Sequence, residues 1–273
     1  MMEFAAETFI ARCLMDPRYL ESLREASQGT VDPSDLERLR LFGGFITKIQ
    51  HNDLWEHFPT TRRLLHDFGL ELPFFADYRA ASFAAGQSKL EPRQKVGAFA
   101  GFLENQILSR PAWRCPGLLE VLRHERHLWE LSFETTTERV ADCVKQLESL
   151  QWKRFLNLIP IFPNPFRMAA FDRDPTAFAA TPGNGGRRSR RVVLGYRKMP
   201  DGSRRVLTLD RISAAILSAV NGRRQVRTVI ARAREAGLRA AQPRQFRNFL
   251  EQAAQAEIIA FLLRLENAPE PKR

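Results

Sequence analysis

Apolar residues recur every three or four positions through most of the first 150 residues, the spacing of a helix with one buried face. The step Asp32-Pro33 predicts a helix start, because aspartate caps a helix and proline fits its first turn. The stripe that follows is interrupted by Gly43-Gly44, and Thr60 or Thr61 is the predicted cap of the next, short helix. Further stripes predict helices near residues 96–107, 118–129 and 140–147. No strand pattern of useful length precedes residue 154, so residues 1–154 are predicted to form an all-helical domain.

The pattern changes in the last 120 residues. Prolines interleave with apolar residues over 155–166, which predicts an extended connector. A first strand is expected at Phe166 to Phe171. Alternating residues before and after the turn Met199-Pro200-Asp201-Gly202 then predict a β-hairpin that ends in Val206 to Leu209. Asp210 is the predicted cap of the first of three further helices, and a final strand is expected near Ile258 to Leu263.

This order of strands and helices predicts a small α+β domain over residues 155–273. It is winged-helix-like, with a three-stranded antiparallel sheet, and a mobile loop is expected at about 176–190, where glycine, proline and arginine dominate. The chain as a whole is therefore predicted to be mainly α, with one all-helical domain and one small winged-helix-like domain.

The charge is divided unevenly between these two domains. The net charge is +11, yet residues 187–273 carry 20 Lys and Arg against 7 Asp and Glu, whereas the rest carries 22 against 24. Composition bias alone would not spare the first two thirds, so an anionic partner is expected for the basic domain. Nucleic acid and an acidic peptide both satisfy this expectation.

The sequence offers no positive case for catalysis in this chain. It has no nucleophile elbow, no phosphate-binding loop and no dinucleotide fingerprint. The pair His124 and His127 lacks the spacing of a zinc helix, so no metal or other cofactor is assigned to the chain. The three cysteines form no close pair, and Glu3 and Glu7 do not suit a secretory signal; both observations favour the cytoplasm.

Two binding modes suit the basic domain. A DNA-binding winged helix would place a polar helix in the major groove, with arginines on the phosphates. A peptide-binding version would add a strand to the sheet edge and seat side chains in a neighbouring groove. The predicted peptide-binding residues are Arg204, Val206, Leu207, Thr208, Phe246, Phe249, Leu250 and Ala253. In the helical domain, aromatic residues are dense, and core packing explains most of them. The predicted partner-interface anchors among them are Trp55, Phe58, Phe74 and Phe75.

Two segments carry a resemblance to known families. Leu207 to Phe261, with Ala-Ala-Ile-Leu-Ser-Ala-Val-Asn-Gly at 214–222 and Phe-Leu-Glu-Gln-Ala-Ala-Gln-Ala-Glu-Ile-Ile at 249–259, resembles the precursor-peptide recognition elements of peptide natural-product pathways. The motif His51-Asn52-x-Leu54-Trp55-x-x-Phe58-Pro59-x-Thr61, followed by Phe74-Phe75-Ala76-x-Tyr78, is similar to a helical domain in partner subunits of multinuclear non-haem iron oxidases. Together, in this order, the two segments resemble the partner proteins of methanobactin biosynthesis.

The resemblance implies a non-catalytic subunit. It implies a heterodimer with an iron-dependent oxidase that holds the iron, so that no cofactor belongs to this chain. It also implies that the chain binds the leader of a ribosomally made precursor peptide and presents its cysteine for conversion to an oxazolone with an adjacent thioamide, as in a copper-chelating peptide. A DNA-binding transcription regulator is the alternative reading. No membrane partner is expected.

Overall fold

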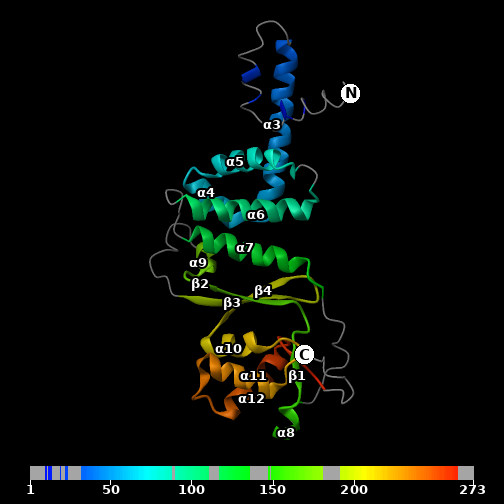
Figure 1. Ribbon diagram of the computed structural model, residues 1–273, viewed down its shortest axis with the longest axis vertical. Coiled ribbons are helices and arrows are strands. Elements are labelled where there is room, and N and C mark those ends of the chain that lie inside the picture. Colours follow the sequence, from blue (N-terminus) through cyan, green and yellow to red (C-terminus); the bar gives the residue numbers. More distant parts are fainter. Residues whose placement is uncertain are drawn as a thin grey trace. The chain divides into compact units, whose positions relative to one another are not determined.

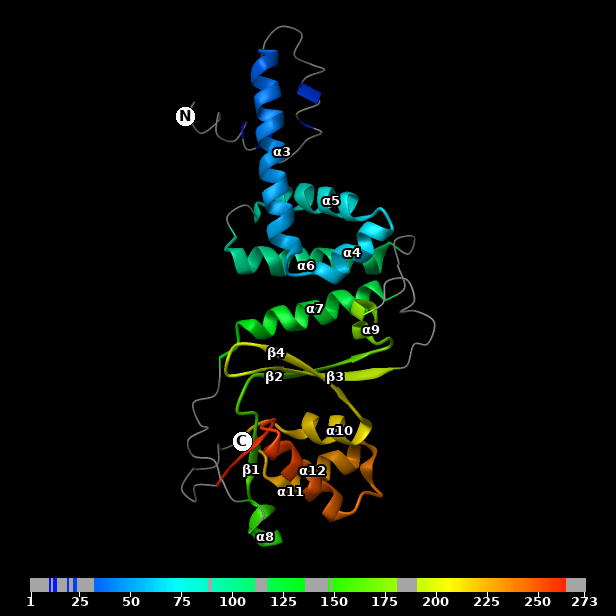
Figure 2. The same ribbon diagram turned by 180° about the vertical axis from the view of Figure 1, so that it is seen from behind.

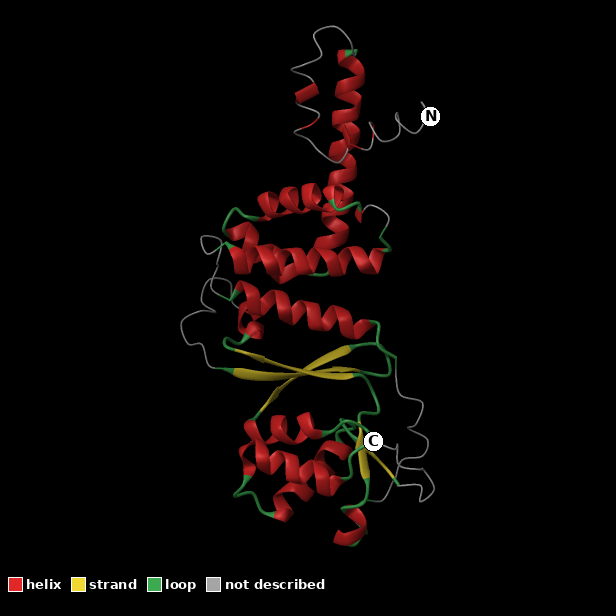
Figure 3. Cartoon of the chain, viewed as in Figure 1, coloured by secondary structure: helices red, strands yellow, loops and turns green. Residues whose placement is uncertain are grey.

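The computed structural model describes residues 10, 12–13, 19, 22–23, 32–87, 90–110, 117–135, 147, 149–180 and 191–263. Helices dominate these residues, and a small three-stranded antiparallel sheet accompanies them, which confirms the predicted mainly α fold with one such sheet (Figure 3). The chain divides into two compact units, Met1–Arg126 with Pro175–Gly186 and His127–Asp174 with Arg187–Arg273. The sequence had placed the boundary at residues 154 and 155 instead.

The first unit is helical in its described residues (Figure 1). Its helices are α3 (Pro33–Trp55), α4 (Pro59–Asp67), α5 (Glu71–Ala84), α6 (Pro92–Ser109), the first part of α7 (Leu118–Ser132) and α9 (Pro175–Ala180). Asp32 caps α3 as predicted, since its Oδ1 accepts the Ser34 amide at 2.8 Å. The predicted interruption at Gly43-Gly44 is wrong: α3 runs through both glycines. A helical glycine costs only about 1 kcal/mol, which the intact turns on either side outweigh.

An aromatic cluster forms the core of this unit, with Phe99 of α6 at its centre. The Phe99 ring centroid lies 4.8 Å from that of Trp55 and 4.9 Å from that of Tyr78. Phe58 and Phe75 follow at 6.1 and 6.4 Å, all in edge-to-face geometry, which suits the quadrupoles of the rings. All five side chains are buried, so α3, α5 and α6 are packed around a single aromatic centre.

The start of α4 depends on a carboxylate from a different helix. The helix begins at Pro59, and its N-cap residue Phe58 offers no side-chain hydrogen bond. The predicted capping by Thr60 or Thr61 is therefore wrong. Instead, the Thr60 amide donates to Glu125 Oε1 at 2.7 Å, and the Thr61 amide and hydroxyl donate to Glu125 Oε2 at 3.0 and 2.7 Å. Glu125 lies on α7 and is buried, and it accepts hydrogen bonds from helix-end amides that have no acceptor within α4.

The second unit holds both sheets. β2 (Phe166–Phe171), β3 (Val192–Lys198) and β4 (Arg204–Leu209) form an antiparallel sheet in the order β2-β3-β4. The predicted hairpin is confirmed, because the Met199 amide bonds the Ser203 carbonyl at 2.7 Å and Gly202 takes the positive φ of 83° that its turn requires. The expected final strand forms β5 (Ala260–Leu262), which pairs with β1 (Ile159–Ile161) in a separate sheet.

Helices fill the rest of this unit. They are α8 (Trp152–Phe155), α10 (Arg211–Ala219), α11 (Val226–Ala233), the π-helical turn η4 (Arg234–Leu238) and α12 (Pro243–Gln255), seen from two sides in Figures 1 and 2. Asp210 caps α10 as predicted, with its Oδ1 accepting the Ser213 amide at 2.7 Å. The buried residues of α10, α11 and α12 share one core with Phe155, Leu158 and Phe261.

Two expectations fall partly outside the described residues. Of the expected mobile loop at 176–190, residues up to 180 belong to helix α9, which begins at Pro175; residues 181–190 lie outside the described chain. The helix expected at 140–147 lies outside it as well, apart from Leu147. None of the helices that the structure describes combines the length and the apolarity needed to cross a bilayer.

Removing the Glu125 carboxylate should destabilise the first unit. Glu125→Ala leaves two buried amides and a hydroxyl without an acceptor, and we expect the free energy of unfolding to fall by about 2–3 kcal/mol. Urea denaturation measures this loss. Glu120→Ala on the same helix, which removes a carboxylate without a hydrogen bond in the described structure, should change stability by less than about 0.5 kcal/mol. Equal effects of the two substitutions would contradict the capping role.

Burial raises the pKa of Glu125 above its ordinary value of 4.5, although the hydrogen bonds from Thr61 and Thr60 oppose the shift. The folded chain therefore holds this proton more tightly than the unfolded chain. The stabilisation from this proton is complete below pH 4.5 and is lost as the pH rises through the raised pKa. The difference in stability between the unsubstituted chain and Glu125→Ala should thus widen as the pH falls toward 4.5, and a constant difference would contradict the raised pKa.

Candidate functional site

The outer edge of β4 is an open sheet edge. In an antiparallel ladder, hydrogen-bonded pairs alternate with pairs whose amides and carbonyls point away from each other. Met199 and Ser203 form a hydrogen-bonded pair at the turn, and the register then makes Arg197–Arg205, Gly195–Leu207 and Val193–Leu209 the next ones. The backbone groups of the intervening β4 residues therefore point outward, away from β3. These residues are Arg204, Val206 and Thr208.

Nothing in the described chain occupies this edge. Strand β4 pairs with β3 alone, and no other described segment makes a backbone hydrogen bond to Arg204, Val206 or Thr208. Three amides and three carbonyls thus lie in a row along one strand. Such a row is a template on which an extended chain can add a further strand.

The side chains of β4 alternate between the two faces of the sheet. Val206 lies in the cluster of Leu131, Leu194 and Tyr196, on the face that the end of α7 covers. Arg204 reaches the same helix, where its Nη1 donates to the Leu128 carbonyl at 3.2 Å. The outward-pointing backbone is therefore held on a strand whose side chains are anchored to the unit, which gives the edge a fixed shape.

Leu207 and Leu209 point to the opposite face, toward α10. Leu209 packs against the helical core, and Leu207 is half-buried. The first turn of α10 adds Ile212, whose side chain is 41% exposed. Besides the apolar side chains of β4 itself, α10 thus presents an exposed apolar side chain directly after this strand in the chain.

The α12 residues that the sequence assigned to a binding groove pack toward the helical core. Phe246, Leu250 and Ala253 are buried in the helical core, at most 4% exposed, and Phe249 is half-buried against that core. On the face of the sheet that carries Leu207 and Leu209, β4 contacts α10, which directly follows it in the chain. Sequence periodicity found the apolar face of α12 correctly but could not tell a face that packs inward from a face that binds a ligand.

The predicted partner-interface anchors are core residues as well. Trp55, Phe58, Phe74 and Phe75 are at most 3% exposed. They surround Phe99 or flank its partners, so they present no surface to another protein. The same helices do expose large apolar side chains, but these lie at other positions: Leu41, Phe42, Phe45, Ile49, Phe68 and Leu72.

Positive charge accompanies the open edge. Arg204, Arg205 and Arg211 are exposed on β4 and at the start of α10. None of the three forms an ion pair with another residue that the structure describes. An extended chain with acidic residues would therefore meet unneutralised guanidinium groups beside the strand.

The second histidine of the pair on α7 lies in an aromatic cluster. The ring of His127 packs on Tyr196 at 5.2 Å and on Phe171 at 6.4 Å between centroids. Burial also raises the pKa of the Tyr196 hydroxyl, which stays protonated in this apolar cluster. Across the described residues, no three His, Cys, Asp or Glu side chains gather as a metal site.

Comparison with known proteins adds no family to this picture. No protein-family model matches the chain, and no curated protein matches it.

The geometry of the edge predicts that proline destabilises the chain to different extents at two neighbouring positions of β4. Thr208→Pro removes an outward amide only and should lower the free energy of unfolding by less than about 1 kcal/mol, whereas Leu207→Pro removes a ladder hydrogen bond and should cost about 3 kcal/mol or more. Denaturant unfolding of the two variants measures the difference. Equal losses would show that the hydrogen-bonding register along β4 is different.

Proposed function

We propose that this chain is a non-catalytic, cytoplasmic subunit that binds the leader of a precursor peptide and presents its cysteine to an iron-dependent oxidase. In this proposal the second unit is a winged-helix-like recognition domain, and the leader adds a strand to the outer edge of β4. The observation that carries the proposal is that edge: three alternate residues whose backbone groups face outward, Arg204, Val206 and Thr208, with no partner strand among the described residues.

The chemistry of the edge favours a peptide. Backbone hydrogen bonds supply affinity without demanding a sequence, while side chains at alternate positions supply specificity. Here Ile212 and Leu207 offer apolar contacts, and Arg205 and Arg211 offer charge to acidic leader residues. Phe246 and Leu250 of α12 share a core with the buried residues of α10. In this proposal they contribute indirectly, because that packing holds α10 beside β4.

The oxidase, in this proposal, holds the iron and performs the oxidation to oxazolone and thioamide. This chain lends no ligand to the metal. Its role is to raise the local concentration of the precursor cysteine at the oxidase, which is the effect of tethering a substrate through a second binding site.

The decisive experiment measures leader binding to edge variants of the whole chain. Isothermal titration with a methanobactin-type precursor peptide, carrying both its leader and its cysteine, should show binding that Thr208→Pro weakens at least about tenfold, because one backbone hydrogen bond and the strand fit are lost. Ala170→Pro is the matched control, since Ala170 is exposed and faces outward on the opposite edge, β2.

Removing the leader from the peptide should abolish binding, and co-purification with a co-expressed methanobactin-type iron-dependent oxidase should survive Thr208→Pro. Unchanged affinity for a leaderless peptide, or an equal loss in Ala170→Pro, would refute strand addition at β4.

DNA binding remains a second candidate because of one observation on α12. Its exposed face carries Arg244, Asn248 and Gln252, side chains of the types that contact phosphates and base edges in the major groove. In this case affinity for duplex DNA falls steeply with salt, and Arg244→Ala weakens it while Thr208→Pro does not. Peptide binding would show the reverse pattern, so the same two variants separate the proposals.

A further inference from the structure

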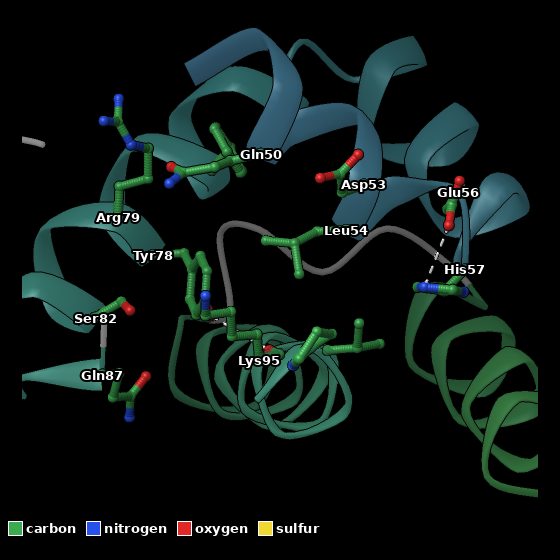
Figure 4. A pocket seen from close by; sticks show the side chains of 13 residues that line it. Gln50, Asp53, Leu54, Glu56, His57, Tyr78, Arg79, Ser82, Gln87 and Lys95 are labelled. Atoms are coloured by element: carbon green, nitrogen blue, oxygen red, sulfur yellow. Dashed lines mark hydrogen bonds and ion pairs between the residues drawn. The ribbon is translucent and has the colours of Figure 1, made fainter. Parts of the chain in front are cut away.

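The first unit contains a cavity of about 430 Å³ between α3, α5 and the start of α6 (Figure 4). This volume lies within the range of small-molecule sites, which are largely apolar with a few placed polar groups. Leu54, Phe75 and Val96 are buried and give the cavity apolar walls. Tyr78 closes one side and is held by its hydroxyl, which donates to the Lys95 carbonyl at 3.3 Å.

Two opposite charges line this cavity without neutralising each other. Asp53 of α3 and Lys95 of α6 lie on opposite sides of it, with Leu54 between them in the view of Figure 4. Neither side chain makes an ion pair or hydrogen bond with any residue that the structure describes. The other acidic side chain there, Glu56, lies 3.5 Å from His57 and is therefore already engaged.

The walls between the two charges are rigid. Arg79 is 4% exposed, and its guanidinium donates to the Thr47 hydroxyl, which ties α5 to α3. Tyr78 joins α5 to α6 in the same way. The three helices that carry Asp53, Tyr78 and Lys95 are thus linked to each other by these hydrogen bonds.

We propose that this cavity binds a small zwitterion with an apolar side chain, such as a free α-amino acid or a dipeptide. The ligand ammonium would meet Asp53, its carboxylate would meet Lys95, and its side chain would pack against Leu54, Phe75 and Val96. This inference concerns the first unit alone and does not depend on the function proposed for β4.

The test uses the whole chain and four probes: L-phenylalanine, the dipeptide Leu-Phe, N-acetyl-L-phenylalanine and L-phenylalanine amide. Nuclear magnetic resonance should show saturable shifts of the Tyr78 and Val96 signals with the two zwitterions. N-acetylation removes the ammonium and amidation removes the carboxylate, so each should weaken binding about fivefold, as expected for partly solvated charge pairs.

Two variants assign each preference to a residue. Asp53→Asn should bind phenylalanine and its N-acetyl form equally, and Lys95→Met should bind phenylalanine and its amide equally. Asp67→Asn and Lys48→Met are the matched controls. Lys48 is exposed on α3, Asp67 is exposed on the neighbouring helix α4, and neither side chain lines the cavity. Thr208→Pro should leave zwitterion binding unchanged, which separates this test from that of the leader site.

The absence of saturable shifts with either zwitterion in the unsubstituted chain would overturn the proposal. Asp53→Asn and Lys95→Met variants that keep the full preference for the charged probe would overturn it as well. The two control variants, Asp67→Asn and Lys48→Met, are expected to keep that preference.

Discussion

The buried carboxylate of Glu125 is the interaction on which the first unit depends. The aromatic core requires Phe58 to be inside, and Phe58 immediately precedes α4, so the first amides of that helix are buried with it. Amides at the start of a helix need an acceptor, and the side chain of the N-cap residue Phe58 supplies none. Glu125 supplies it from α7, and the cost of burying a carboxylate appears as its raised pKa. Core packing and polar satisfaction therefore fix α4 and α7 together.

The second unit solves a different problem, that of a small sheet with two edges. Strand β3 is paired on both sides, whereas β2 and β4 each leave one row of backbone groups free in the described structure. Free edges invite pairing with other chains, and proteins either shield them or use them. On β4 the strand is anchored by Val206 and Arg204 and surrounded by exposed arginines, which suits the use of this edge as a binding site.

The two candidate sites differ in what defines them. The edge of β4 is defined by backbone geometry, with side chains only refining the choice of ligand. The cavity of the first unit is defined by side chains alone, and its two unpaired charges, Asp53 and Lys95, come from helices some 40 residues apart in sequence. The two proposed sites therefore invoke distinct binding chemistries, one of the backbone and one of side-chain charge.

The sequence by itself determined the local elements: the Asp32 and Asp210 caps, the hairpin at Gly202 and the strand at Phe166 to Phe171, because these depend on neighbouring residues. The tertiary structure decided which apolar faces are buried. Periodicity marks Phe246 and Trp55 as apolar-face residues, but only the packing shows that both belong to the core. Likewise, only the tertiary structure places Glu125 at the start of α4 and Asp53 across the cavity from Lys95. Contacts between residues distant in sequence leave no local signal. The apolar pattern of a segment predicts the type of element it forms, but it does not predict which other element packs against it.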